Sequence, residues 1–432
     1  MDISTLYKLF RTHSCVTTDS RNCPEGSIFF ALKGDVFNGN AFASNALDKG
    51  CSYAVVDEQS YLVQNDNRYI LVGDVLNTLQ ELANYHRRQL GTKMIAITGT
   101  NGKTTTKELI ASVLSQKFNV LYTQGNLNNH IGVPLTLLQL NKDHDWTVIE
   151  MGASYPGEIK LLTEIAEPDY GLITNVGKAH LEGFGSFEGV IKTKGELYDY
   201  LRNKKNSKVF IHYDNPYLMN ISHGLDLVPY GAEESLYING KVESNSPYLS
   251  ITWKAGEKGE QHLVHTQLIG AYNFTNVLAA VTIGHFLQVN ASDIDEALAS
   301  YSPRNNRSQL KETEHNTLII DAYNANPTSM MAALENFRIM DAEHKTVILG
   351  DMRELGTDSA MEHQRIIDYL DEAHFEHVAL VGEQFAASKH KYDSYKNVGE
   401  LIEFIKESKP EHKTILIKGS NSIKLQQLAM YL

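Results

Sequence analysis

The stretch MIAITGTNGKTTTKELIASVL, Met94–Leu114, constrains the fold of this chain more than any other part of its sequence. It begins as an apolar strand at Met94–Ile97, turns through a glycine-containing loop, and continues as an amphipathic helix at Thr104–Gln116. A buried strand followed within a few residues by a helix is the repeating unit of parallel α/β folds. We therefore expect a parallel sheet with helices packed on it.

The loop Gly99-Thr100-Asn101-Gly102-Lys103-Thr104 has the composition of a phosphate-binding loop. Glycine lets the backbone turn tightly so that its N–H groups point at phosphate oxygens, and the helix N-terminus adds partial positive charge. In such a loop Lys103 reaches the β- and γ-phosphates and the Thr104 hydroxyl coordinates Mg²⁺. The strict spacing requires glycine at position 97, where this chain has Ile97, so a purely structural strand–helix turn is the alternative. The strand and helix that flank the loop favour nucleotide binding.

Further strands alternate with helical sequence after this loop. We predict them at Asn119–Tyr122, Trp146–Met151 and Tyr170–Asn175, which indicates a doubly wound sheet. The stretch Ser235–Leu268 then alternates polar and apolar residues around Asn-Gly and Gly-Glu turns, a pattern typical of β-hairpins. A helix is predicted to follow at Asn273–Leu287.

A proline and a polar cluster at Tyr301–Gln309 predict a linker. Residues before about 90 contain short strand-like runs of their own, so we predict three α/β domains. They are a small N-terminal domain at 1–90, a central domain at 91–303 with the P-loop sheet and its hairpin extension, and a Rossmann-like C-terminal domain at 304–432. The strands of the C-terminal domain are expected at Thr317–Asp321, Thr346–Gly350, His377–Val381 and Thr414–Lys418.

The formal net charge of −13 argues against a general nucleic-acid-binding protein, which would carry a basic stripe. The N-terminal residues lack the pattern of a secretory signal, and no apolar run reaches the roughly 18 to 20 residues that span a bilayer. We expect a cytoplasmic monomer with no nucleic-acid partner and no membrane span. Cys15, Cys23 and Cys51 form no Cys-x-x-Cys pair and are expected to be free thiols.

Two further residues are candidate metal ligands. Glu150 ends the predicted strand in WTVIEMGAS, at the carboxyl edge where ligands bind in such sheets, and His180 follows the next strand. Taken singly, a strand-end carboxylate is usually only solvated, and a loop histidine usually has no metal. Both are predicted at the same edge as Thr104, however, and phosphoryl transfer requires carboxylate or imidazole ligands for its metal.

Longer motifs resemble one enzyme family. The blocks TGTNGKTTTKE at Thr98–Glu108, AHLEGFGS at Ala179–Ser186 and GAYNFTNVLAA at Gly270–Ala280 resemble the Mur ligases, which form amide bonds with ATP in peptidoglycan synthesis. Other motifs resemble the branch of that family that joins D-alanyl-D-alanine to UDP-N-acetylmuramoyl-tripeptide. They are GNLNNHIGVPLTLL at 125–138, DAYNANPTSM at 321–330, GDMRELG at 350–356 and IKGSNS at 417–422.

The resemblance spans all three predicted domains and implies ATP and Mg²⁺ as cofactors. It implies that ATP phosphorylates the terminal carboxylate of the tripeptide, and that the amine of the dipeptide then attacks the acyl phosphate. An α-amino group has a pKa near 8, so an appreciable fraction is neutral at cytoplasmic pH without a strongly perturbed base. The main tasks are then to position two anions and to neutralise charge.

The resemblance also implies functions for individual residues by their positions in the motifs. The implied catalytic residues are Lys103, His180 and Lys194, and Mg²⁺ is implied to lie among Thr104, Glu150, His180 and Lys194. Lys194 is implied to carry a carbamate formed with carbon dioxide; an ordinary helix-surface lysine is the alternative. The implied nucleotide contacts are Thr98, Gly99, Thr100, Asn101, Gly102, Lys103, Thr104, Thr105, Asn276, Arg307 and Asp321, with helix capping as the alternative for Asn276.

The substrate contacts are implied in the same way. They are Asp19, Ser20, Arg21 and Lys33 for the uridine-diphosphate sugar, Asn126, Asn128 and Asn129 for its peptide, and Asn324, Asn326, Lys418 and Ser420 for the incoming dipeptide. A plain surface loop is the alternative at KGSN. Three positions depart from the pattern of the family: Asn38-Gly39-Asn40 where Asp-Gly-His is frequent, Asn306 where glycine is frequent, and Asn421 where arginine is frequent.

Two other functions stay open at this point. One is a different amide ligase on the same scaffold, such as the ligase that adds the third amino acid or a folylpolyglutamate synthetase. The other is a P-loop regulatory module that hydrolyses ATP without a second substrate. The blocks GNLNN, DAYNANP and GDMRELG argue against the first, and a complete third domain with polar strand ends argues against the second.

Overall fold

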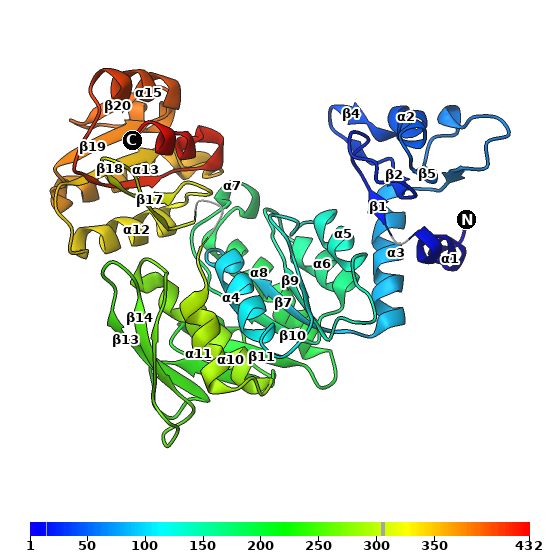
Figure 1. Cartoon of the computed structure of the whole chain (residues 1–432), viewed down its shortest axis with the longest axis horizontal. Coiled ribbons are helices and arrows are strands. Elements are labelled where there is room, and N and C mark those ends of the chain that lie inside the picture. The colour runs from blue at the N-terminus through cyan, green and yellow to red at the C-terminus, as the bar shows by residue number, and fades with distance from the viewer. Residues whose placement is uncertain (14, 304–306) are drawn as a thin grey trace.

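A computed structural model describes residues 1–13, 15–303 and 307–432. Asn306, one of the three positions that depart from the pattern of the family, lies outside the described residues. Three consecutive stretches of the chain each build their own sheet, of four, nine and six strands (Figure 1). In Figure 1 the N-terminal and C-terminal sheets lie at opposite ends of the molecule, above the central sheet. The predicted α/β class with a parallel central sheet is confirmed.

The N-terminal unit is a parallel sheet in the order β1-β2-β5-β6, with a small ribbon β3–β4 beside it. Its long helix α3 begins where the Asp74 side chain accepts a hydrogen bond from the backbone N–H of Asn77, and ends at Gly91 with φ +68°. The elements are α1 (Ile3–His13), β1 (Val16–Thr17), β2 (Ile28–Phe30), β3 (Lys33–Gly34), β4 (Phe37–Asn38), α2 (Ala43–Asp48), β5 (Tyr53–Val56), β6 (Tyr69–Leu71) and α3 (Val75–Leu90).

The central sheet has the order β15-β14-β13-β12-β11-β10-β7-β9-β8 and is parallel from β13 to β8. The chain leaves β7 toward β8 and β9 and then returns past it to β10, which opens a crevice at the carboxyl end of β7. Its strands are β7 (Lys93–Thr98), β8 (Val120–Tyr122), β9 (Trp146–Glu150), β10 (Tyr170–Ile173), β11 (Lys208–His212), β12 (Leu227–Gly231), β13 (Ile238–Ser244), β14 (Ser250–Lys254) and β15 (His262–His265).

Helices cover both faces of this sheet because its central strands are apolar on both sides. In β7, Ile95 and Ile97 pack into the core beneath α4, α10 and α11, whereas Met94 and Ala96 pack into the core beneath α6 and α8. The helices are α4 (Lys103–Leu114), α5 (Gly132–Leu137), α6 (Glu158–Ala166), α7 (Leu181–Phe184), α8 (Phe187–Arg202), α9 (Pro216–Asn220), α10 (Phe274–Phe286) and α11 (Ala291–Ser300).

The predicted hairpin extension is present as antiparallel strands β13, β14 and β15, but one predicted turn is wrong. Asn239-Gly240 lies inside β13, and the chain turns later, between Ser244 and Ser250. A side chain at Gly240 would collide with the carbonyl oxygen of Thr252, at 2.5 Å from the added Cβ. This glycine therefore serves a close approach between strands, which a sequence pattern does not distinguish from a turn.

The C-terminal sheet has the order β16-β17-β21-β18-β19-β20 and is parallel except for β16 at its edge. Strand β16 lies outside the expected strands and overlaps the predicted linker at Gln309, because it is short and half-polar. The elements are β16 (Gln309–Glu312), β17 (Thr317–Asp321), α12 (Pro327–Ile339), β18 (Lys345–Gly350), α13 (Ser359–Ala373), β19 (His377–Val381), α14 (Glu383–Ala387), β20 (Asp393–Tyr395), α15 (Val398–Glu407) and β21 (Thr414–Lys418).

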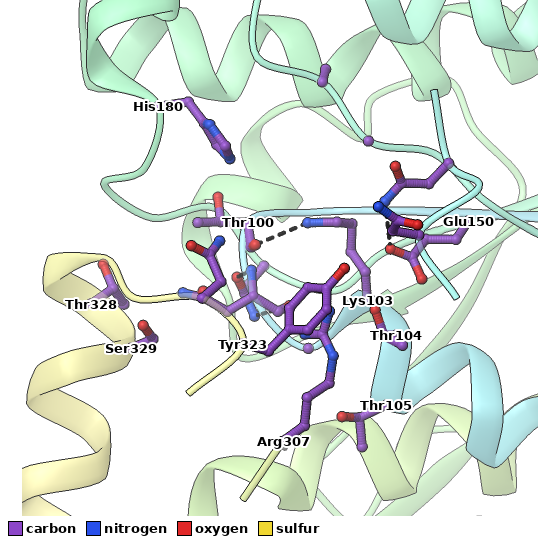
Figure 2. A pocket seen from close by; sticks show the side chains of 18 of the residues that line it. Thr100, Lys103, Thr104, Thr105, Glu150, His180, Arg307, Tyr323, Thr328 and Ser329 are labelled. Atoms are coloured by element: carbon purple, nitrogen blue, oxygen red, sulfur yellow. Dashed lines mark hydrogen bonds between the residues drawn. The ribbon is translucent and has the colours of Figure 1, made fainter. Parts of the chain in front are cut away.

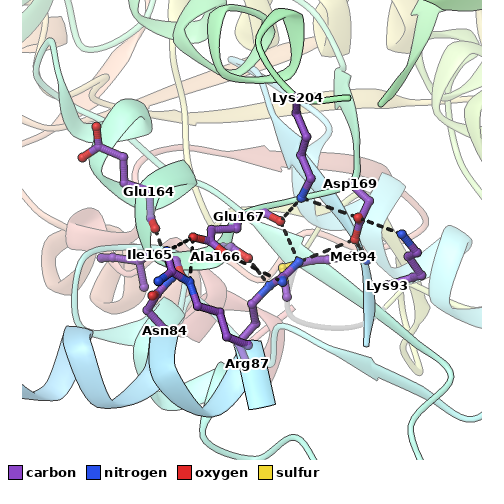
Figure 3. A network of polar contacts seen from close by, with 11 residues as sticks. Asn84, Arg87, Lys93, Met94, Glu164, Ile165, Ala166, Glu167, Asp169 and Lys204 are labelled. Carbon is purple, nitrogen blue, oxygen red and sulfur yellow. Dashed lines mark hydrogen bonds and ion pairs between the residues drawn. The ribbon is translucent and has the colours of Figure 1, made fainter. Parts of the chain in front are cut away.

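A network centred on Arg87 joins α3 of the N-terminal unit to the central unit (Figure 3). The buried Arg87 guanidinium donates from Nε to the carbonyl of Ala166 and from Nη2 to that of Glu167, both at 2.7 Å. Asn84 donates to the carbonyl of Ile165 at 2.9 Å. These carbonyls end α6, so α3 supplies the donors that the terminus of α6 requires.

Several side-chain contacts join the C-terminal unit to the central unit. Lys178, in the segment after β10, donates to Glu362 of α13 at 2.7 Å, and the Ser246 hydroxyl of the β13–β14 turn accepts a hydrogen bond from the Asp341 backbone N–H. The predicted free thiols are confirmed, since all three cysteines are unpaired. None of the helices in the described ranges has the length and apolar character needed to cross a membrane.

Candidate functional site

A cavity of about 830 Å³ lies at the carboxyl edge of the central sheet, where the C-terminal unit faces it (Figure 2). The central unit contributes the loop after β7, the end of β9 and the segments after β8 and β10. The C-terminal unit contributes the end of β17, the start of α12 and the end of β21. The predicted residues that line the cavity are Thr100, Asn101, Gly102, Lys103, Thr104, Thr105, Asn126, Asn128, Asn129, Glu150, His180, Asn276, Arg307, Asp321, Asn324 and Lys418.

Two glycines determine the course of the loop between β7 and α4. Gly99 has φ +141°, and a Cβ there would lie 2.1 Å from the Thr174 hydroxyl. Gly102 has φ +79°, and a Cβ there would lie 2.6 Å from the Asn276 side-chain oxygen. Any other residue at either position would have a strained backbone and would require Thr174 or Asn276 to move.

Residues at the end of β10 hold this loop in place. The Asn175 side chain accepts a hydrogen bond from the Asn101 backbone N–H at 2.9 Å and donates one to the Asn101 carbonyl at 3.0 Å. The Thr174 hydroxyl donates to the same carbonyl at 2.6 Å. The loop is thus preorganised by neighbouring strand ends, although Thr174 and Asn175 were not among the predicted residues.

Lys103 folds back along its own loop. Its Nζ donates to the carbonyls of Gly99 and Thr100 at 2.7 and 3.0 Å. Removal from solvent lowers the pKa of Lys103 to about 8; the nearby Glu150 opposes this shift and Arg307 reinforces it. An anion bound in the loop would offset the desolvation of this ammonium group.

Glu150 ends β9 as predicted and is almost fully buried. Its Oε1 accepts a hydrogen bond from the Asn128 side chain at 2.8 Å, whereas Oε2 has no hydrogen-bond partner among the described residues. Lys107 of α4 lies 3.8 Å from that free oxygen. Burial lowers the pKa of Lys107, while Glu150 and Glu108 favour its charged form.

His180 precedes α7 in a left-handed conformation, with φ +51°. Its Nδ1 contacts a carboxylate oxygen of Glu354 from the C-terminal unit, and the hydrogen bond from His180 lowers the pKa of Glu354. Within the described parts of the chain, no three His, Cys, Asp or Glu side chains form a group that could hold a metal ion. His180 and Glu150 therefore share the cavity without forming a preassembled metal cluster.

Lys194 lies on α8 behind the cavity wall. It is buried, its Nζ donates to the carbonyl of Ala153 at 3.3 Å, and the ammonium lies 5.2 Å from the centre of the Phe184 ring. Burial holds the pKa of Lys194 well below its ordinary value, and repulsion from Lys103 acts in the same direction. This environment contradicts the alternative of an ordinary surface lysine.

The C-terminal unit contributes a charged pair and a stacked pair to the cavity. Asp321 at the end of β17 accepts a hydrogen bond from Lys418 at the end of the neighbouring strand β21, at 2.5 Å. The Arg307 guanidinium lies 3.8 Å from the centre of the Tyr323 ring. Figure 2 shows this stacked pair facing the helix that carries Lys103, Thr104 and Thr105.

Several predicted residues already have protein partners. Asn326 caps α12 and donates from Nδ2 to the Asn101 side chain at 2.8 Å. Asn276 lies inside α10 and accepts a hydrogen bond from the Thr106 hydroxyl at 3.0 Å, so the helix-capping alternative for it is wrong. Ser420 is buried beside the cavity and accepts a hydrogen bond from the Arg353 backbone N–H. Thr98 and Gly99 also lie behind the cavity wall rather than on it.

The predicted residues of the N-terminal unit lie away from this cavity. Asp19 pairs with Arg21 at 2.9 Å on the surface, near Ser20, and Lys33 pairs with Asp57 at 3.0 Å. Asn40, which stands where histidine is frequent in the family, is buried, and its side chain donates a hydrogen bond to Asp57 at 2.8 Å. Its amide therefore has a structural role in the loop that carries Lys33.

Sequence reasoning missed Lys107, Glu354 and Tyr323. Each lies within a motif that was recognised, namely TGTNGKTTTKE, GDMRELG and DAYNANP. The motif positions could have drawn attention to them, but their contacts depend on how three separate stretches of chain pack together.

Models of three protein families match this chain in order along its length. They are the Mur ligase family catalytic domain at residues 12–87, the Mur ligase middle domain at 97–284, and the Mur ligase glutamate ligase domain at 306–421. Among curated relatives, UDP-N-acetylmuramoyl-tripeptide--D-alanyl-D-alanine ligase of Bacillus subtilis is 33% identical, with 96% of this chain and 92% of the relative covered. The enzyme of the same name from Escherichia coli is 32% identical, with 96% and 93% covered.

Solved structures agree with these sequence relatives. A crystal structure of MurF from Acinetobacter baumannii has a TM-score of 0.86 at 30% identity and covers 96% of this chain and 92% of its own. The MurF ligase of Thermotoga maritima, crystallised in complex with ADP, has a TM-score of 0.85 at 25% identity, with 96% of both chains covered. By its sequence, its fold and the order of its three units, this chain belongs to the Mur ligase family.

Proposed function

We propose that this chain joins D-alanyl-D-alanine to UDP-N-acetylmuramoyl-tripeptide with hydrolysis of ATP to ADP and phosphate, in the synthesis of peptidoglycan precursors. The observation that carries this proposal is the convergence on one cavity of a glycine-constrained phosphate loop, the strand-end Glu150, and the polar strand ends of a separate C-terminal sheet. The names of the relatives that match across nearly the whole chain support this substrate pair.

The proposed reaction has two steps. The terminal carboxylate of the tripeptide attacks the γ-phosphorus of ATP, which forms an acyl phosphate and releases ADP. The neutral amine of the dipeptide then attacks the acyl carbon; a C–N bond forms, the C–O bond to phosphate breaks, and the amine proton passes to solvent or phosphate. Because the pKa of an α-amino group is near 8, the protein needs mainly to position the two substrates and stabilise charge.

The nucleotide is proposed to lie along the loop Gly99–Thr105, with Lys103 at its terminal phosphates and Arg307 and Asp321 contributed from the C-terminal unit. Mg²⁺ fits the donors present, because it commonly takes one or two carboxylates together with phosphate oxygens and water. Thr104 and the Glu150 carboxylate would hold it, with His180 nearby, and it would neutralise charge on the transferred phosphoryl group. Asn276 is proposed to contact the adenine from the base of the cavity.

The two substrates are proposed to reach this cavity from opposite sides. Residues Asp19, Ser20, Arg21 and Lys33 would bind the uridine-diphosphate sugar in the N-terminal unit, and Asn126, Asn128 and Asn129 would contact its peptide. Asn324 and Lys418 line the cavity on its C-terminal side and would bind the dipeptide. Asn326 and Ser420 would support this site through their hydrogen bonds to Asn101 and to the Arg353 backbone. We also propose that the chain works as a monomer in the cytoplasm.

We assign a carbamate to Lys194. The reaction requires a neutral amine, which is scarce for an ordinary lysine, and the burial of Lys194 lowers its pKa in the direction that supplies it. The amine nitrogen would bond to the carbon of CO₂ and release one proton. The resulting carbamate would replace a positive charge near Lys103 with a negative one able to act as a ligand.

The deciding experiment measures ADP release with UDP-N-acetylmuramoyl-tripeptide, with and without D-alanyl-D-alanine. We expect sustained release over many turnovers only when both substrates are present, and no turnover when D-alanyl-D-alanine is replaced by a single amino acid. ADP release that ignores every added amine would instead indicate a regulatory ATPase. Release with glutamate and a folate substrate, or with the dipeptide stage of the precursor and its third amino acid, would indicate one of the other amide ligases.

A further inference from the structure

Lys107 on α4 is a charged side chain that the proposed reaction does not use. It is completely buried, and its Nζ has no hydrogen-bond partner in the described part of the chain. Two carboxylate oxygens, Oε2 of Glu150 and Oε1 of Glu108, each lie 3.8 Å from it. A buried ammonium without hydrogen bonds is costly, so its presence here requires a reason.

Both carboxylates are hydrogen-bonded to other partners through their second oxygen. The Asn128 side chain holds Oε1 of Glu150 at 2.8 Å, and the Tyr301 hydroxyl holds Oε2 of Glu108 at 2.6 Å. At 3.8 Å the charges still attract one another, but the geometry is too long for a hydrogen bond. The lysine is therefore balanced between two fixed anions rather than bonded to either.

Glu150 is in contact with both the cavity and Lys107. Glu150 lines the cavity, whereas Lys107 lies behind it among buried residues, three positions along α4 from Thr104. The oxygen of Glu150 that lies nearest to Lys107 is also its free oxygen, Oε2. That oxygen is shielded from solvent. A cation bound in the cavity and the lysine would therefore share the Glu150 carboxylate as a whole.

We propose that Lys107 is a positioning residue whose ammonium serves as the internal counter-charge of Glu150 until a divalent cation binds. This inference rests on the proposed function, in which Glu150 holds the cation. An uncompensated buried carboxylate would take up a proton or destabilise the fold. A fully hydrogen-bonded pair would bind the carboxylate more strongly and compete with the cation for it. The long pair between two anchored carboxylates meets both requirements.

The proposal gives opposite signs for two substitutions. In Lys107→Met the repulsion between ammonium and cation is lost, so at a pH high enough to keep Glu150 ionised the cation should bind at least about tenfold more tightly. In Glu108→Gln the lysine retains only Glu150 as a counter-charge, so the cation should bind more weakly. General damage to the site would weaken binding in both variants.

The test is a titration of the full chain with Mn²⁺ in the presence of ADP, followed by electron paramagnetic resonance of the free ion. The matched control is Lys117→Met, which removes an exposed lysine just beyond the end of α4 and should leave the affinity unchanged. Circular dichroism confirms that each variant is folded.

The outcomes separate this proposal from the proposed function. If the unaltered chain with ADP binds no Mn²⁺, the cation site itself is wrong and the role of Lys107 falls with it. If the unaltered chain binds Mn²⁺ and Lys107→Met binds it equally or more weakly, the proposal is overturned while the function stands. Should Lys107→Met fail to fold, Glu108→Gln decides alone, and unchanged or tighter binding there overturns the proposal.

Discussion

The side chain of Asn326 donates a hydrogen bond to the side chain of Asn101 at 2.8 Å and so ties the start of α12 to the loop after β7. The same Asn326 side chain accepts a hydrogen bond from the backbone N–H of Ser329, which caps the helix. Asn326 therefore combines a local function with a contact between two units, made to a residue 225 positions away in the sequence.

Substitutions at Asn326 should separate these two functions. Serine preserves an N-cap acceptor but loses the amide that reaches Asn101, whereas alanine loses both. We expect Asn326→Ala to lower the unfolding free energy by about 1 kcal/mol more than Asn326→Ser. Both variants should lose about fivefold in kcat/KM, because one neutral hydrogen bond contributes about 1 kcal/mol and this energy corresponds to a factor of about five. Full activity of Asn326→Ser would show that the contact with Asn101 does not matter for the reaction.

Lys103→Ala should abolish most of the ligase activity without unfolding the protein. The side chain bonds only to carbonyls of its own loop, so the fold does not depend on it. Loss of a donor that stabilises transferring phosphate should lower kcat by about a hundredfold to a thousandfold. The measurement is ADP release together with a melting curve, and the exposed Lys160→Ala serves as control. A near-normal rate with a normal melting curve contradicts the proposed role.

Lys194→Ala should lose most of the activity and regain part of it with short-chain carboxylic acids. A small acid anion can take the place of the carbamate in the space that the truncated side chain leaves. Lys192→Ala, which changes an exposed lysine two positions earlier on α8, should stay active and show no response to the acids. Initial rates over a series of formate and acetate concentrations measure the rescue. A fully active Lys194→Ala would refute the carbamate.

Arg87→Met should destabilise the junction between α3 and α6. The substitution leaves the carbonyls of Ala166 and Glu167 without these donors and removes a buried cation that lies 3.6 Å from Asp169. Breaking a buried charged network of this kind costs about 3 kcal/mol or more. The neighbouring Arg88 is exposed, and Arg88→Ala should cost about 0–1 kcal/mol. Thermal unfolding of both variants gives the comparison, and equal melting temperatures would contradict the prediction.

The protein should lose stability as the pH falls below about 6.5. Burial lowers the pKa of both His86 and His363 in the folded chain, so the unfolded chain binds more protons in this range. His363 donates from Nδ1 to the Ser359 carbonyl and accepts at Nε2 from the Met352 N–H, and protonation of Nε2 would break the second bond. Melting temperatures between pH 7.5 and 5.5 should fall less steeply for His363→Gln. Identical slopes would contradict this assignment.

The parts of the fold that the sequence predicted are those governed by local patterns. Strands β17 and β19 have the predicted limits, because apolar runs bounded by polar residues identify buried parallel strands. Asn239-Gly240 was misassigned because a glycine required for close packing has the same local pattern as a glycine in a turn. The domain limits at 90 and 303 stay predictions, since neither the sheets nor the matched families fix a boundary residue.

The candidate site was partly predictable for the same reason. Strand ends and motifs pointed to Lys103, Glu150, His180, Arg307 and Asp321, and all five line one cavity. The contacts of Lys107 and of Glu354 were not predictable, because they depend on packing between separate elements and leave no spacing in the sequence. The ligand roles themselves stay predictions until binding is measured.

The C-terminal unit is attached to the cavity through loops rather than through the sheet. Asn326 contacts the loop after β7, and Glu362 and Glu354 contact the segment after β10 at Lys178 and His180. A nucleotide bound in the cavity would order these same loops. The two events are then thermodynamically reciprocal: the factor by which docking of the unit tightens nucleotide binding equals the factor by which nucleotide tightens docking. Any substitution that weakens one of these contacts therefore lowers nucleotide affinity, even where it touches no nucleotide atom.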